Sequence, residues 1–77
     1  MNKLGRKQLE EIKGKLEEIQ QNISDLSQEE RDKFDNLSEG LQASEKGQKY
    51  EEIANYLEEA ESYLDNVMEN IDNALEG

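Results

Sequence analysis

Carboxylates are the reactive groups that this chain holds in greatest number. Its 77 residues include 20 aspartates and glutamates against 9 lysines and arginines, which gives a formal net charge of −11. Acidic pairs recur seven residues apart, and two aspartates extend the row: Glu10/Glu11, Glu17/Glu18, Glu51/Glu52, Glu58/Glu59, Asp65 and Asp72. Seven residues make two helical turns, about 10.5 Å, so these pairs line one side of a helix.

Two interpretations of the acidic rows are open. A rod of regularly spaced negative charge imitates the DNA backbone and could occupy the basic groove of a DNA-binding protein. Alternatively, the rows are the solvated outer face of an amphipathic helix, where glutamate favours helicity and solubility. We favour the second interpretation, because a heptad pattern produces this spacing automatically and the basic start of the chain interrupts a uniformly negative surface.

Residue types that support catalysis or metal binding are missing. The chain has no histidine and no cysteine, which removes the usual general base, the thiol nucleophile and the common zinc ligands. It has neither a calcium-binding loop motif nor a glycine-rich phosphate loop. The sequence therefore predicts a protein that is not an enzyme and that uses no cofactor and no metal.

Large side chains beside the apolar pattern of the second half are candidates for binding another protein. Tyrosine and methionine are enriched at protein interfaces, and Tyr56 and Tyr63 lie seven residues apart. With the neighbouring carboxylates, they form the set of candidate partner-binding residues: Tyr56, Tyr63, Met68, Glu51, Glu52, Glu58, Glu59 and Asp65. The simpler interpretation places the tyrosines at the edge of a core shared by copies of the chain.

Two heptad patterns must position these side chains. Apolar residues alternate at steps of three and four, in one run from Leu9 to Leu26 and in a second run from Tyr50 to Ala74: Leu9, Ile12, Leu16, Ile19, Ile23, Leu26, and Tyr50, Ile53, Leu57, Ala60, Leu64, Val67, Ile71, Ala74. Such spacing keeps one stripe of a helix apolar and requires a partner for it. The sequence predicts an all-α, coiled-coil-like hairpin of two helices in a single domain, residues 1–77.

Charge favours an antiparallel arrangement of the two helices. Residues 1–15 carry a net charge of +3, and residues 50–77 carry −9 with no basic residue. An antiparallel hairpin brings these two segments together, whereas a parallel pair would separate them. The basic residues Lys3, Arg6 and Lys7 then neutralise the acidic helix, and we expect no direct binding of nucleic acid.

Turn and cap residues predict the helix boundaries. We expect a first helix over about 4–38, a turn over about 39–44 with Gly40 at a left-handed cap, and a second helix over about 45–75. Ser44 is a suitable N-cap, with Glu45 at the positive helix start. Ser27 to Glu30 resembles a capping box, so a kink near Ser27 is the alternative to a continuous first helix.

The second stripe is wider than the first, because Ala54, Tyr56, Tyr63, Met68 and Leu75 flank it. A wide apolar stripe can contact two neighbours, and a lone hairpin of this size has a small core. We therefore expect two copies to form a four-helix bundle. No apolar stretch is long enough to span a membrane, which favours a cytoplasmic protein.

The segment from Phe34 to Gly47 resembles the turn of small acidic helical-hairpin proteins found in Gram-positive bacteria, their prophages and mobile elements. In that family the turn reads Asp-Asn-Leu-Pro-Glu-Ser/Gly-Leu-Gln, and Ser38 stands here in place of the proline. The resemblance implies a phage or mobile-element accessory protein in a bacterial host and transfers no functional residue. Together with the heptads, it predicts a non-enzymatic protein-interaction module; an inhibitor that mimics DNA is the alternative.

Overall fold

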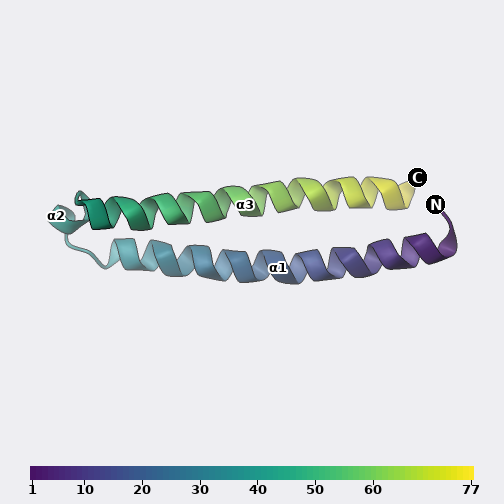
Figure 1. Cartoon of the computed structure of the whole chain (residues 1–77), viewed down its shortest axis with the longest axis horizontal. Helices are drawn as coiled ribbons and strands as arrows, with labels where there is room; N and C mark the ends of the chain where they lie inside the picture. The colour runs from purple at the N-terminus through teal and green to yellow at the C-terminus, as the bar shows by residue number, and fades with distance from the viewer.

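The structure is a computed structural model that describes all 77 residues, and it consists of helices joined by short connections. Helix α1 spans Lys3–Asp35, α2 spans Glu39–Gln42 and α3 spans Glu45–Glu76. The long helices α1 and α3 lie side by side and antiparallel, with α2 at the turn and both termini at the other end (Figure 1). The expectation of an all-α chain is confirmed. The rod measures 58 × 15 × 13 Å, and neither long helix contains the apolar run that a bilayer crossing requires.

Short polar side chains begin each helix. The side-chain oxygen of Asn2 accepts from the backbone N–H of Gly5 at 2.7 Å, and that of Ser44 accepts from Gly47 at 3.4 Å. Both caps satisfy an N–H group that lacks a partner within the helix. The start of α3 therefore follows the prediction from Ser44 and Glu45.

The turn differs from the sequence prediction. Helix α1 ends at Asp35, not near residue 38, and Ser38 caps a new four-residue helix, α2, by accepting from the N–H of Leu41. Gly40 lies inside α2, and no residue of the chain has a positive φ, so the expected left-handed cap at Gly40 is wrong. The chain instead leaves α1 after Asp35 and reverses direction through the short helix α2, which Ser38 caps.

Helix α1 is continuous through Ser27. Ser27 does not act as an N-cap; instead it is one of three buried residues, the others being Gly47 and Ala54. The register that places Arg6 beside Leu75 and Gln20 beside Glu61 also places Ser27 opposite Ala54. Small residues at such a crossing let two helices approach closely, which explains why a serine is buried at this position.

Packing between α1 and α3 keeps Leu9, Leu16 and Ile23 of the predicted heptad but uses Lys13, Gln20 and Ser27 in place of Ile12, Ile19 and Leu26. Half-buried or buried positions of α1 alternate between apolar and polar residues: Leu9, Lys13, Leu16, Gln20, Ile23 and Ser27. The matching stripe of α3 consists of Ala54, Leu57, Glu61, Leu64, Met68 and Ile71. A pair of helices has one line of contact, and this line follows these stripes. One apolar row of each helix borders this line of contact, and its large side chains stay roughly half exposed.

Candidate protein interface

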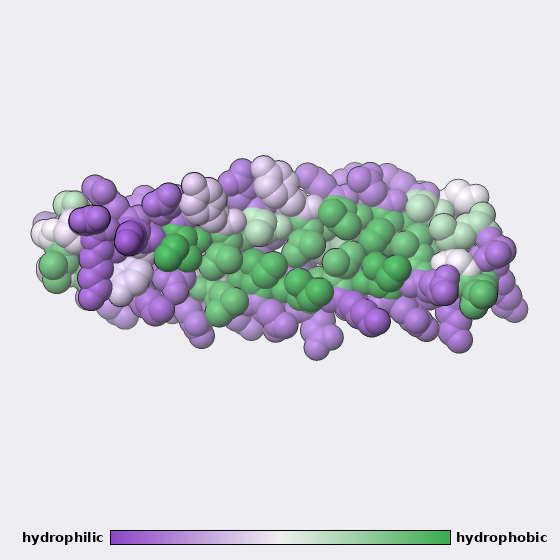
Figure 2. Space-filling model, viewed as in Figure 1, coloured by the Kyte–Doolittle hydropathy of each residue, from purple (hydrophilic) through white to green (hydrophobic).

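The rows that border the α1–α3 contact form a single apolar surface, here called the open apolar face. It consists of Ile12, Ile19 and Leu26 from α1 and of Ile53, Ala60, Val67 and Ala74 from α3. Its large side chains are 43–51% exposed. Figure 2 shows apolar residues running as a continuous band along the middle of the rod. From residue 53 to residue 74 the band extends about 32 Å along α3.

The opposite side of the hairpin is closed by polar contacts between the two helices. Four side chains of α1, here called the polar ladder, each bond to α3: Arg6, Lys13, Gln20 and Arg31. Arg6 donates to the main-chain oxygen of Leu75, and Lys13 forms an ion pair with Asp72. The hairpin is therefore two-sided, with its interhelical hydrogen bonds on one side and unpartnered apolar residues on the other.

Two rungs of the polar ladder use candidate carboxylates. The Arg31 guanidinium donates to Glu58 at 2.7 Å and to the Asn55 side chain at 3.1 Å. The Gln20 amide donates to Asp65 at 2.6 Å and to the main-chain oxygen of Glu61 at 3.0 Å. The hydrogen bond to Glu58 raises the pKa of Arg31, as the bond to Asp72 raises the pKa of Lys13. Glu58 and Asp65 therefore take part in contacts between α1 and α3.

Tyr56 and Tyr63 border the open apolar face along its α3 edge, where they are 64% and 61% exposed. Helical spacing places them in the row adjacent to Ile53, Ala60 and Val67. The Tyr63 hydroxyl donates to the Glu59 carboxylate at 2.9 Å. That hydrogen bond, strengthened by the nearby negative charge, raises the pKa of Tyr63. Each tyrosine thus presents an apolar ring with a polar tip, which suits the edge of an interface.

The predicted partner-binding residues do not form one site. Met68 is half-buried on the polar-ladder side, away from the two tyrosines. Glu51 shares the helical row of Glu58 and Asp65, while Glu52 and Glu59 lie in a row facing away from α1. The structure places the tyrosines beside the apolar rows, and it places Glu51, Glu52 and Glu59 around Tyr56 on the outer surface of α3.

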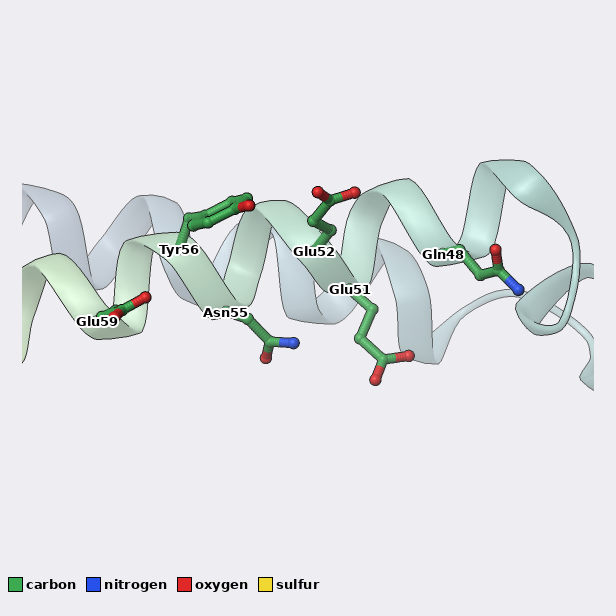
Figure 3. A pocket seen from close by; sticks show the side chains of 6 residues that line it. All are labelled: Gln48, Glu51, Glu52, Asn55, Tyr56 and Glu59. Carbon is green, nitrogen blue, oxygen red and sulfur yellow. The ribbon is translucent and has the colours of Figure 1, made fainter.

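A shallow hollow lies over the outer surface of α3 (Figure 3). Its lining residues all come from this one helix: Gln48, Glu51, Glu52, Asn55, Tyr56 and Glu59. Their side chains spread away from one another, and no second element forms an opposing wall. Such a surface does not surround a small molecule as ligand pockets do. No group of three or more carboxylates is arranged to hold a metal ion.

The sequence pattern does not predict that Ile12, Ile19 and Leu26 are exposed, because their heptad phase assigns them to the contact with α3. The sequence does contain a pattern that indicates the observed contact, in the helical row next to the predicted one. Arg6, Lys13, Gln20 and Ser27 follow each other at seven-residue steps, as do Gly47, Ala54 and Glu61 on the second helix. Long polar or small residues repeated in this way can form a helix contact, with stems packed and polar ends bonded across.

Comparison with protein-family models, curated proteins and solved structures finds no match to this chain.

Proposed function

We propose that this protein is a non-enzymatic protein-interaction module that works as a homodimer, in which two hairpins cover each other's open apolar faces in a four-helix bundle. The supporting observation is the exposure of Ile12, Ile19, Leu26, Ile53 and Val67 on one side of the hairpin. Scattered exposed apolar residues are ordinary, but a continuous band of them marks a contact surface.

The weak core of a single hairpin supports the same proposal. Only three of 77 residues are buried, and no large side chain is fully buried. Burying the exposed half of a leucine or isoleucine stabilises a structure by about 1 kcal/mol. A second copy provides this burial for every residue of the open apolar face at once, and twofold symmetry doubles the gain.

The dimer would bind a further protein through the surface that remains. Tyr56 and Tyr63 lie at the edge of the open apolar face and keep their outer parts accessible. Glu52 and Glu59 carry charge beside them. The proposed origin, a phage or mobile element of a bacterium, rests on the turn resemblance alone.

Mimicry of DNA is less well supported by the geometry. Glu58 and Asp72 form ion pairs with Arg31 and Lys13, so the acidic row along that edge is partly neutralised within the hairpin. A mimic would bind a basic target with an affinity that falls steeply with salt. Reversing Glu52 and Glu59 to lysine should then abolish binding, while a contact through Tyr56 and Tyr63 would tolerate salt.

Two leucines with the same exposure offer a matched test of the dimer. Leu26 lies in the open apolar face and Leu41 lies at the turn, and both are 51% exposed in the single hairpin. In a dimer, Leu26→Gln would place an amide in the interface and destabilise the folded state by roughly 2 kcal/mol per chain. Leu41→Gln should destabilise the folded state by only about 1 kcal/mol, because it loses just the half of the side chain that the single hairpin already buries.

Urea unfolding of both variants at low and high protein concentration provides the measurement. The wild type and Leu41→Gln should become more stable as concentration rises, because dimerisation stabilises the folded state. Leu26→Gln should lose most of that dependence. Equal effects of the two substitutions, with no concentration dependence in any protein, would contradict the proposed function.

A further inference from the structure

We infer that the second hairpin docks with its turn at the same end of the bundle, so that α1 of each chain lies against α3 of the other. This inference rests on the proposed function, in which a second copy covers the open apolar face. It adds the orientation, and with it the identity of the side chains that meet.

Two symmetric arrangements can bury the open apolar face against a copy of itself. A twofold axis parallel to the helices keeps both turns at one end and stacks α1 on the partner's α3. A twofold axis across the helices puts the turns at opposite ends and stacks α1 on α1 and α3 on α3. Neighbouring helices are antiparallel in both arrangements, so helix direction does not distinguish them.

Charge distinguishes the two arrangements. Helix α3 carries ten acidic and two basic residues, a net charge of −8, whereas α1 carries nine acidic and seven basic residues, a net charge of −2. The opposite-end dimer would place two α3 helices, each without a basic residue after Lys49, directly side by side. The same-end dimer separates them, because each α3 then has only α1 helices as nearest neighbours. Like charges at neighbouring-helix distance repel, and the alternating arrangement reduces that repulsion.

The edges of the open apolar face are complementary in the same-end dimer. The row beside the face on α1 contains Lys15 and Glu29, and the equivalent row on α3 contains Lys49 and Tyr63. A twofold axis parallel to the helices keeps each residue at its own height along the rod. The register set by Gln20 and Glu61 then brings Glu29 within one turn of the partner subunit's Lys49.

The same symmetry brings Lys15 to the partner subunit's Tyr63. That tyrosine donates its hydroxyl to Glu59, so the ammonium group would meet both an aromatic ring and a carboxylate. In the opposite-end dimer, Lys15 and Glu29 would face residues of the partner's α1, and Lys49 would face its α3. Neither of the two pairs would then form.

A distance between the two turns tests the orientation. The chain has no cysteine, and a Cβ at Gly40 would meet nothing within 4 Å, so Gly40→Cys introduces one label site at the turn. With a nitroxide attached, double electron–electron resonance should give an intermolecular distance within roughly 30 Å, the width of a four-helix bundle with its labels. The opposite-end dimer would give a distance close to the 58 Å length of the rod.

The possible results distinguish a dimer of the other orientation from a protein that does not dimerise. A short distance supports the inference. A long distance from a protein of dimeric mass overturns the inference and leaves the proposed function standing. A protein of monomeric mass with no intermolecular distance overturns both, and leaves the open apolar face for a different protein.

Charge reversal at the edge gives a second measurement. Within one chain, Glu29 and Lys49 lie on the outer edges of different helices and form no ion pair. Lys49→Glu should therefore weaken the dimer roughly 3- to 10-fold through its contact with the partner's Glu29, and adding Glu29→Lys should restore the affinity. Independent, additive effects of the two reversals would overturn the same-end arrangement.

Discussion

The side-chain amide of Gln20 donates a hydrogen bond to the main-chain carbonyl oxygen of Glu61, 3.0 Å away, and also bonds to Asp65. The amide reaches α3 from the row of α1 adjacent to Leu16 and Ile23. Its contact helps to fix both the register of the two helices and the rotation of α1 about its axis. That rotation turns Ile12, Ile19 and Leu26 outward and so creates the open apolar face.

Neighbouring glutamines allow the Gln20 contact to be tested. Gln20→Ala should destabilise the protein by about 1 kcal/mol, because it removes hydrogen bonds to α3 at a half-buried position. Gln21 points outward and bonds only to Asp25 of its own helix, at 3.0 Å, so Gln21→Ala should change stability by no more than about 0.5 kcal/mol. Chemical denaturation at a fixed protein concentration measures both values. Equal losses would show that the Gln20 contact does not hold the helices together.

Two glycines are predicted to respond to alanine with opposite signs. A Cβ at Gly47 would overlap the main-chain carbonyl oxygens of Leu41 and Gln42, whereas a Cβ at Gly14 would meet nothing within 4 Å. Gly47→Ala should therefore destabilise the protein by about 1–3 kcal/mol, since the turn must move away. Gly14→Ala should stabilise it by about 0.5–1 kcal/mol through helix propensity. Thermal unfolding checks the pair, and a stabilising Gly47→Ala would contradict the close approach of the turn to α3.

Tyr63 should titrate at a higher pH than an isolated tyrosine. Its pKa is raised from 10.0 by the hydrogen bond to Glu59 and by the negative charge of that carboxylate. The raised value means that the folded state favours the protonated phenol. The resulting stabilisation is therefore fully present below pH 10.0 and is lost as the pH rises through the raised value.

Carbon-13 NMR of the Tyr63 ring resolves this titration. Glu59→Gln should lower the pKa of Tyr63 toward 10.0, because the neutral amide no longer opposes the phenolate. Glu52→Gln provides the control, since Glu52 lies in the same row as Glu59 and forms no hydrogen bond with Tyr63. An identical Tyr63 titration in the wild type and Glu59→Gln would disprove the interaction.

Much of the architecture follows from local sequence signals. The apolar periodicity predicts the all-helical chain, and Ser44 with Glu45 predicts the start of α3, where the structure has it. The serine cap at Ser38 was not predicted, because a four-residue helix is too short to show any periodicity. The prediction of a left-handed Gly40 rests on residue type alone. In the structure Ser38 caps α2, and the turn contains no left-handed residue.

The side of α1 that faces α3 was not predictable from hydropathy. Both the row of Leu9, Leu16 and Ile23 and the row of Ile12 and Ile19 are apolar, so hydropathy does not say which neighbouring row completes the contact. Lys13 and Gln20 decide this by reaching polar groups on α3. The energies of such cross-helix bonds depend on three-dimensional register, which a one-dimensional pattern does not contain.

Sedimentation equilibrium of the wild-type chain tests most directly whether a second copy covers the open apolar face. We predict a species of twice the 8.9 kDa chain mass that dissociates on dilution with loss of helicity, because the isolated hairpin buries so little apolar surface. A folded species that keeps the mass and the helicity of a single chain at every concentration would contradict it.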